Sequence, residues 1–231
     1  TRRSSDLLPH HVTQRGNRRQ PTFFQAADYQ AYLTILAEEC RRCAVALWAY
    51  CLMPNHTHLL PVPSSAEGLA AAIGETHRRY SVMINRRERW TGYLWQGRFA
   101  SFPLEGAHLL HAVRYIERNP VRAGLVVDPW AYPWSSAAAR VLGVDNPLLS
   151  LEPLQGMVED WRALLAVEPD AATLAILRAH THTGRPLGSL AFLADLEAHT
   201  GRPVLPRKRG RPNRESGRRP DRKSTRLNSS H

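Results

Sequence analysis

The chain has 231 residues, of which 43% are hydrophobic and 22% are charged, and its net charge at neutral pH is +11. The composition excludes collagen, a coiled coil and a wholly disordered chain, and no run reaches the roughly 18 apolar residues of a membrane-spanning helix. The first residues lack the apolar stretch of a secretory signal. Because the three cysteines are too few for a disulfide scaffold, we expect a reducing compartment and therefore a cytoplasmic protein.

The first part of the chain predicts a strand, a helix and two adjacent strands. Residues 10–24 alternate in polarity and then turn at Gly16, which indicates a strand followed by a basic loop. Residues 26–42 carry apolar side chains at helical spacing. Residues 44–53 form an apolar run of strand length, and a second strand-like stretch, HTHLLPV, follows directly after a break at Pro54.

The next part predicts a helix, a strand and a further helix. Ser64 and Glu67 have the spacing of a capping box, which opens a helix. Residues 93–102 resemble a strand, and residues 104–118 a helix that Pro120 prevents from continuing. This element order favours a split βαβ arrangement, in which helices cover one face of an antiparallel sheet.

We divide the chain into three parts. Residues 1–143 hold the predicted elements above, and residues 144–205 form a mainly helical segment that prolines interrupt. Residues 206–231 are rich in Arg, Pro, Gly and Ser, with almost no apolar content, which predicts a disordered basic tail. Its closing stretch, RKSTRLNSSH, resembles translated adapter or vector sequence, and we expect it to be non-native.

The positive charge is concentrated in the body and the tail, with an acidic connector between them over residues 144–200. This distribution favours a polyanionic partner, nucleic acid first. Lys208 and Lys223 are the only lysines, and arginine binds phosphate and guanine through two parallel hydrogen bonds. A GC-rich genome would produce the same arginine excess without functional meaning, so both explanations stay open.

Two histidines after Pro54 have metal-ligand spacing. Residues i and i+2 of a strand project from the same face, so the imidazoles of His56 and His58 can converge on one ion while Thr57 points into the packing. Such a pair leaves room on a metal for phosphate, which suits a Lewis acid. The pair could equally be two surface histidines, because the same spacing recurs at His180 and His182, in a segment that we expect to be a loop.

A tyrosine on the helix predicted over residues 104–118 is the second candidate. Tyr115 lies off the apolar stripe of that helix, so its phenol could reach a substrate as a nucleophile. An ordinary half-buried tyrosine is the alternative. Asn119 follows one turn later and would face the same way if the helix persisted, although the proline after it disfavours helical geometry there.

Five segments are similar to those of a known family: HVTQRGNRRQ, LMPNHTHLL, LWQGRFASF, RYIERNPVRAGLV and YPWSS, in this order. Together they resemble the REP-associated tyrosine transposases, members of the single-tyrosine HUH superfamily of single-strand DNA endonucleases. The resemblance covers roughly residues 10–143. It implies an α+β fold with a ferredoxin-like βαββαβ core, an antiparallel sheet with helices on one face.

The resemblance also implies roles for individual residues. His56 and His58 match the paired metal ligands, with Thr57 in place of the bulky apolar residue of the family motif. Tyr115 matches the nucleophile, and Asn119 occupies the position of an amide-type third ligand. The family uses Mg²⁺ or Mn²⁺, and imidazole ligation makes Mn²⁺ at least as suitable as Mg²⁺.

The implied reaction is cleavage and rejoining of single-stranded DNA through a 5′-phosphotyrosine, used in DNA transposition. It needs no nucleotide cofactor, because the covalent intermediate conserves the bond energy. We therefore expect a single-stranded or hairpin (REP-like) DNA partner, no membrane, and a bacterial nucleoid-associated protein, a monomer with a dimer as the alternative. Two other functions stay open: a hairpin-binding protein that no longer cuts, and a metal phosphodiesterase that uses water, with Tyr115 structural.

The predicted DNA contacts are basic and aromatic. Three arginines flank the turn after the first strand, where phosphates could dock. A tryptophan and an arginine near residues 93–102 resemble a platform for unpaired bases, although the ring could be core. In the tail, PRKRGRP resembles an AT-hook for the minor groove of A·T-rich DNA, or adds only non-specific affinity. The contacts are Arg15, Arg18, Arg19, Trp95, Arg98, Arg122, Arg207, Lys208, Arg209 and Arg211.

Overall fold

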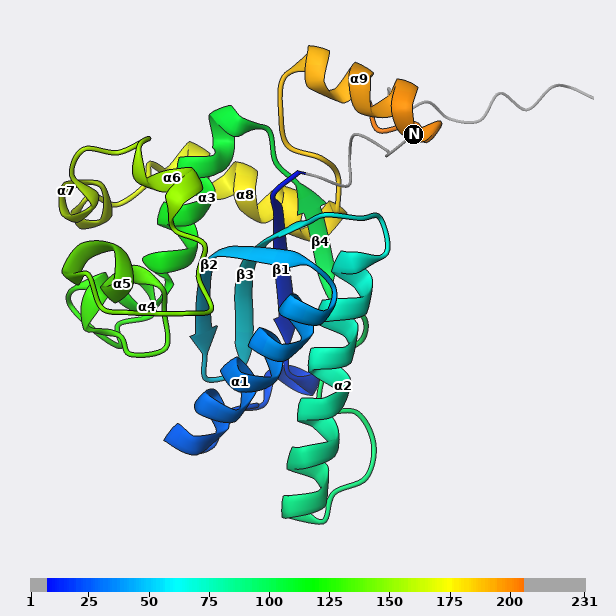
Figure 1. The fold of residues 1–231 in the computed structure, drawn as a ribbon, viewed down its shortest axis with the longest axis vertical. Helices are drawn as coiled ribbons and strands as arrows, with labels where there is room; N and C mark the ends of the chain where they lie inside the picture. Colours follow the sequence, from blue (N-terminus) through cyan, green and yellow to red (C-terminus); the bar gives the residue numbers. More distant parts are fainter. Residues whose placement is uncertain (1–7, 206–231) are drawn as a thin grey trace, which may run out of the picture.

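A two-residue turn at Pro54 and Asn55 folds β2 (Val45–Met53) back onto β3 (His56–Pro63), with Met53 opposite His56. The computed structural model describes residues 8–205, so the predicted tail contacts Arg207, Lys208, Arg209 and Arg211 lie outside the described residues. β1 (His10–Arg15) pairs with β3 on one side and with β4 (Ala100–Pro103) on the other. The result is a four-stranded antiparallel sheet in the order β2-β3-β1-β4 (Figure 1).

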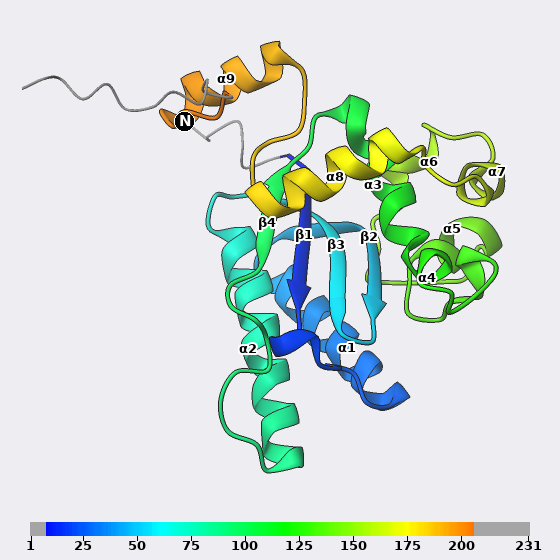
Figure 2. The ribbon, with the colours of Figure 1, turned by 180° about the vertical axis from the view of Figure 1, so that it is seen from behind.

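Both faces of this sheet are covered by helices. α1 (Ala26–Arg42) and α2 (Gly68–Glu88) pack on one face, which completes the expected ferredoxin-like βαββαβ order. α3 (Gly106–Glu117) and α8 (Ala171–Thr183) lie across the opposite face (Figures 1 and 2). The sequence did not predict this second layer. Alternate residues of the strands supply the two cores, with Leu59 in the first and Leu60 in the second.

Short helices follow α3. They are α4 (Asn119–Arg122), α5 (Ala137–Leu142), α6 (Glu152–Gln155), α7 (Trp161–Ala166) and α9 (Leu190–Thr200), with the 3-10 turn η3 (Pro129–Ala131); a second 3-10 turn, η2 (Asn17–Arg19), comes directly after β1. Trp161, Leu177 and Leu187 belong to the same core as α3, so the segment after residue 143 packs into the body of the protein. No helix in the described part of the chain is long and apolar enough to cross a membrane.

Before residue 104, the sequence predictions of local structure were wrong over residues 93–102 and at Ser64. The strand expected over residues 93–102 begins only at Ala100. Leu94 and Gln96 do hydrogen-bond to the end of β1, but the chain turns at Gly97, where φ is positive, and the pairing breaks. The capping box is also absent: α2 begins at Gly68, whose amide donates to the Ser65 hydroxyl at 3.2 Å.

A buried carboxylate joins the two helices of the first layer. Asp28 on α1 accepts hydrogen bonds from the Phe24 amide at 2.8 Å and the Gln25 amide at 3.3 Å, and it forms an ion pair with Arg87 on α2. Burial opposes ionisation of this carboxyl, but the hydrogen bonds from Arg87 and the two amides outweigh it, so the pKa of Asp28 is lowered. The ionised form is therefore the one that stabilises the fold.

We predict that Asp28→Asn lowers the free energy of unfolding at pH 7 by about 2 kcal/mol, because it removes charge-assisted hydrogen bonds. The pKa of Asp28 is lower in the folded than in the unfolded state, where it is about 3.9. Its stabilisation is thus complete above that value and is lost as the pH falls through the lowered pKa. Denaturant unfolding should show that the difference in the free energy of unfolding between the wild type and Asp28→Asn becomes smaller below about pH 4.

Glu75→Gln is the matched control, because Glu75 pairs with Arg78 on the exposed surface of α2. It should change stability little at any pH. An Asp28→Asn effect that is as large at acid pH as at neutral pH would show that the carboxylate charge is not what joins α1 to α2.

Candidate active site

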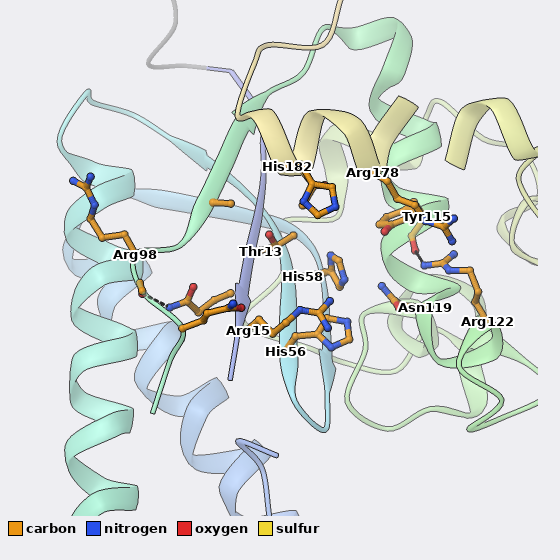
Figure 3. Close-up of a pocket in the computed structure, with 15 residues that line it drawn as sticks. Thr13, Arg15, His56, His58, Arg98, Tyr115, Asn119, Arg122, Arg178 and His182 are labelled. Carbon is orange, nitrogen blue, oxygen red and sulfur yellow. Dashed lines mark hydrogen bonds between the residues drawn. The ribbon is translucent and has the colours of Figure 1, made fainter. Parts of the chain in front are cut away.

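A pocket of about 550 Å³ opens on the second face of the sheet, between β1, β3, α3, α4 and α8 (Figure 3). Its lining brings together the residues that the sequence singled out for chemistry: His56, His58, Tyr115 and Asn119. It also contains four arginines and, among the described residues that line it, no carboxylate. The site is therefore cationic, and it suits an anionic ligand.

The alternation of β3 directs both histidines into this pocket. His56 and His58 share the face of Leu60, which packs in the second core with α3, whereas Leu59 packs in the first core. Thr57 is fully buried, as predicted. β1 lies alongside with Thr13 opposite His58, so both central strands contribute to the floor of the pocket.

His56 is held with one ring nitrogen free. Its Nδ1 lies 2.6 Å from the Asn55 side-chain oxygen, and an amide oxygen only accepts, so the proton is on Nδ1 and Nε2 keeps its lone pair. Burial, and then repulsion from Arg15 and Arg122, lowers the pKa of His56 to about 4. The ring is therefore neutral at pH 7, the form that binds a metal.

His58 is held by a third histidine, His11 on β1. His11 Nε2 lies 3.0 Å from His58 Nδ1, and the two rings are stacked with centroids 5.2 Å apart. Burial lowers the pKa of His11 to about 3 and that of His58 well below its usual value, so both rings are neutral. When His11 accepts the proton of His58 Nδ1, the Nε2 lone pair of His58 is free to bind a ligand.

Tyr115 lies against this pair from α3. Its ring centroid is 5.6 Å from that of His58, edge-on, and 5.7 Å from that of His11. The prediction that Tyr115 lies off the buried face was wrong, because only 7% of the residue is exposed. The Arg122 guanidinium sits over the ring, 4.4 Å from its centroid, and would stabilise negative charge on the phenol oxygen.

Asn119 reaches the pocket because the chain makes one more turn after α3. The helix breaks at Arg118 and resumes as α4, with Pro120 at the start, where its missing amide hydrogen costs nothing. No three His, Cys, Asp or Glu side chains converge on a metal position within residues 8–205. Asn119, which the resemblance implies as the third ligand, lines the pocket together with His56 and His58, and two imidazoles with an amide oxygen form a neutral donor set that fits a divalent cation.

Of the predicted DNA contacts in the described part of the chain, some line the pocket and others do not. Arg15 and Arg122 line the pocket, and Arg98 borders it with its guanidinium extended toward α2 (Figure 3). Arg18 and Arg19 are exposed on the turn after β1 and do not line the pocket.

The turn after β1 needs glycine at its start, because a Cβ on Gly16 would lie 2.3 Å from the Gln20 carbonyl oxygen.

The prediction that Trp95 stacks on unpaired bases was wrong. Its ring is 6% exposed and packs among Phe23, Tyr32 and Tyr80, where the first core needs its apolar area.

A buried ion pair fixes the tyrosine helix. Glu117, two residues after Tyr115, accepts from Arg140 at 2.7 Å and from the Ser136 hydroxyl at 2.5 Å, and both charged side chains are almost fully buried. Ser136 also bonds the backbone of Tyr50 on β2. The YPWSS segment thus joins α3 to the edge of the sheet.

The family model described as IS200-like transposase matches residues 4–119 of this chain. The chain belongs to the IS200-like transposase family. This confirms, at the level of the family, the resemblance that the five sequence segments indicate. The matched region ends at Asn119 and so contains the histidine pair and Tyr115.

One solved structure supports the fold of this transposase. A REP-associated tyrosine transposase bound to a REP hairpin is 19% identical, with a TM-score of 0.52 over 63% of this chain and 86% of that chain. A candidate transposase from Deinococcus radiodurans is 20% identical over 48% of this chain and 89% of that chain, but its TM-score of 0.37 carries no argument. No curated protein shows significant similarity.

Sequence reasoning missed three residues near the site. His11 could have been found from the alternation of β1, which gives it the face of Thr13 and Arg15. Arg178 and His182 line the pocket from α8, a segment expected to be loop. On this helix His180 and His182 do not share a face: His180 contacts Phe102, and only His182 reaches the pocket.

We predict that Glu117→Ala lowers the free energy of unfolding by roughly 3 kcal/mol, because it leaves the Arg140 charge buried without a partner. Glu168→Ala is the matched control: Glu168 also pairs with an arginine, Arg118, but is 45% exposed, and its loss should cost under about 1 kcal/mol. Equal losses in denaturant unfolding would show that the Glu117–Arg140 pair does not anchor α3.

Proposed function

We propose that this transposase cleaves and rejoins single-stranded DNA with Tyr115 as the nucleophile. The observation that carries the proposal is the position of the Tyr115 ring, 5.6 Å from the ring of His58 in a cationic pocket without carboxylates. A phenol beside paired neutral imidazoles and arginines suits attack on a phosphodiester.

The pocket residues have distinct roles in this reaction. Arg15 and Arg122 bind the phosphate backbone, and Arg122 also stabilises the phenolate of Tyr115. The phenol gives its proton to water, and its oxygen attacks phosphorus in line with the 3′ oxygen. The bond from phosphorus to the 3′ oxygen breaks, and that oxygen takes up a proton. The products are a 5′-phosphotyrosine and a free 3′-OH, and the reverse step rejoins a strand without a nucleotide cofactor.

His56, His58 and Asn119 would hold a divalent cation, Mg²⁺ or Mn²⁺, which when bound supplies Lewis-acid polarisation of the scissile phosphate. Asn55 keeps His56 in the tautomer that this requires, and His58 adopts the same tautomer when His11 Nε2 accepts its Nδ1 proton. Because all three ligands are neutral and arginines surround them, a phosphate oxygen of the DNA would complete the site.

We infer that the substrate is a hairpin with an adjacent single strand, in keeping with the REP hairpin bound by the structurally similar transposase. Work on such DNA would associate the protein with the nucleoid in the bacterial cytoplasm. The two other functions are less well supported. A water-using phosphodiesterase would leave Tyr115 without a chemical role, although Tyr115 lines the pocket beside His58. A protein that binds without cutting has no use for a phenol oriented toward a histidine pair.

We predict that the protein forms a covalent adduct with a labelled single-stranded hairpin in the presence of Mn²⁺, and that Tyr115→Phe abolishes the adduct. The phenylalanine keeps the ring contacts with His58 and His11 while it removes the nucleophilic oxygen. Denaturing gel electrophoresis measures the adduct. Cleavage without an adduct would indicate the phosphodiesterase, and binding without cleavage the hairpin-binding protein.

We predict that His11→Leu weakens Mn²⁺ binding by about tenfold or more, because it removes the acceptor that orients His58. His11→Gln, whose amide oxygen can take the place of Nε2, should retain most of the affinity. Mn²⁺ titration followed by electron paramagnetic resonance, without DNA, measures both, and thermal unfolding shows that both are folded. Wild-type affinity in His11→Leu would mean that His11 does not orient His58.

A further inference from the structure

Helix α8 forms one wall of the active-site pocket, although it lies beyond residue 119, where the family model ends. Arg178, Thr181 and His182 line the pocket from this helix. They have the i, i+3, i+4 spacing of a single helix face. Figure 3 shows Arg178 beside Tyr115 and Arg122, with His182 above the histidine pair.

The body of the protein holds α8 firmly in this place. Leu177 is 1% exposed in the second core, and the His180 ring lies 5.8 Å from that of Phe102 on β4. The chain after α8 then pairs alongside the end of β4: the Leu187 amide donates to the Pro103 carbonyl at 3.0 Å, and the Glu105 amide donates to the Leu187 carbonyl at 2.9 Å. Because Leu177 and His180 hold one side of α8 against the protein, the side that carries Arg178, Thr181 and His182 faces the pocket.

Arg178 is exposed and forms no ion pair among residues 8–205. It also lies close enough to Arg122 that its charge adds to the effect of burial in lowering the pKa of Arg122. Glu168 also acts on Arg122, but it does not line the pocket, and neither does any other carboxylate of the described residues. Two neighbouring guanidinium groups in such a lining are a favourable position for a phosphate. His182 lies four residues further, about 6 Å along the helix axis, so the two side chains follow a line across the pocket.

We propose that α8 is a substrate-binding wall of the transposase, on which Arg178 binds a backbone phosphate next to the scissile one and His182 donates a hydrogen bond to the same strand. The ligand is single-stranded DNA, so this inference rests on the proposed function. It makes the helical segment after residue 143 part of the active site, and it gives the strand a second row of contacts opposite Arg15.

The test measures binding apart from chemistry. Tyr115→Phe protein is titrated with a labelled single-stranded oligonucleotide in EDTA, by fluorescence anisotropy at several salt concentrations. Adding Arg178→Ala should weaken binding about tenfold, the value of a charge-assisted hydrogen bond, and should lower the slope of log affinity against log salt by about 0.7, the value for one phosphate contact on a single strand. Arg178→Lys should restore the slope, and His182→Ala should weaken binding about threefold with the slope unchanged.

Arg185→Ala is the matched control, because Arg185 is exposed just after α8 and does not line the pocket. It should weaken binding less than about twofold, since it removes charge without a contact. Equal losses of DNA affinity in Arg178→Ala and Arg185→Ala, or an unchanged salt slope in Arg178→Ala, would show that α8 is not a substrate-binding wall.

The covalent-adduct experiment is independent of this one. An adduct with no effect of Arg178 would leave the transposase mechanism standing without the wall. Loss of affinity in Arg178→Ala without any adduct would support the wall while refuting the mechanism.

Discussion

Side-chain alternation along β3 is the constraint on which the rest of the site depends. A strand of this sheet has two buried faces, and successive residues must go to opposite ones. Because Leu59 goes to the layer of α1 and α2, His58 must go to the layer of α3. A shift of one residue in register would turn Thr57 into the pocket and bury the imidazoles of His56 and His58 against α1 and α2. The hairpin at Pro54 sets this register.

The tyrosine has no such local determinant, and tertiary contacts place it instead. α3 is held by the buried pair of Glu117 and Arg140 and by apolar side chains such as Val113 and Ile116. These contacts explain why the sequence around Tyr115 contains so many residues that never touch the pocket. They hold the Tyr115 ring edge-on against that of His58.

Much of this could be predicted from the sequence. The strand and helix order follows from periodicity, and the resemblance of the five segments singled out His56, His58 and Tyr115, which the structure brings to one pocket. The second helical layer could not, because the helices after residue 143 have weak amphipathic patterns and are placed by contacts with distant residues such as Phe102. The prediction for Trp95 was wrong for a related reason. The sequence pattern of an aromatic residue near an arginine is the same whether the ring is buried in the core or exposed on the surface. His11 was missed because its importance depends on which strand lies beside β3.

The second core, which the sheet and the later helices share, determines how cooperatively the protein unfolds. Tyr115 on α3, Phe102 on β4 and Leu177 on α8 lie in one continuous apolar cluster. A chain ended at residue 143 would leave one side of that cluster facing water, so the sheet and the later helices should melt in a single cooperative transition. The pocket residues and the helices that cover them would then be gained or lost together, and proteolysis after residue 143 would unfold the pocket rather than release a smaller intact domain.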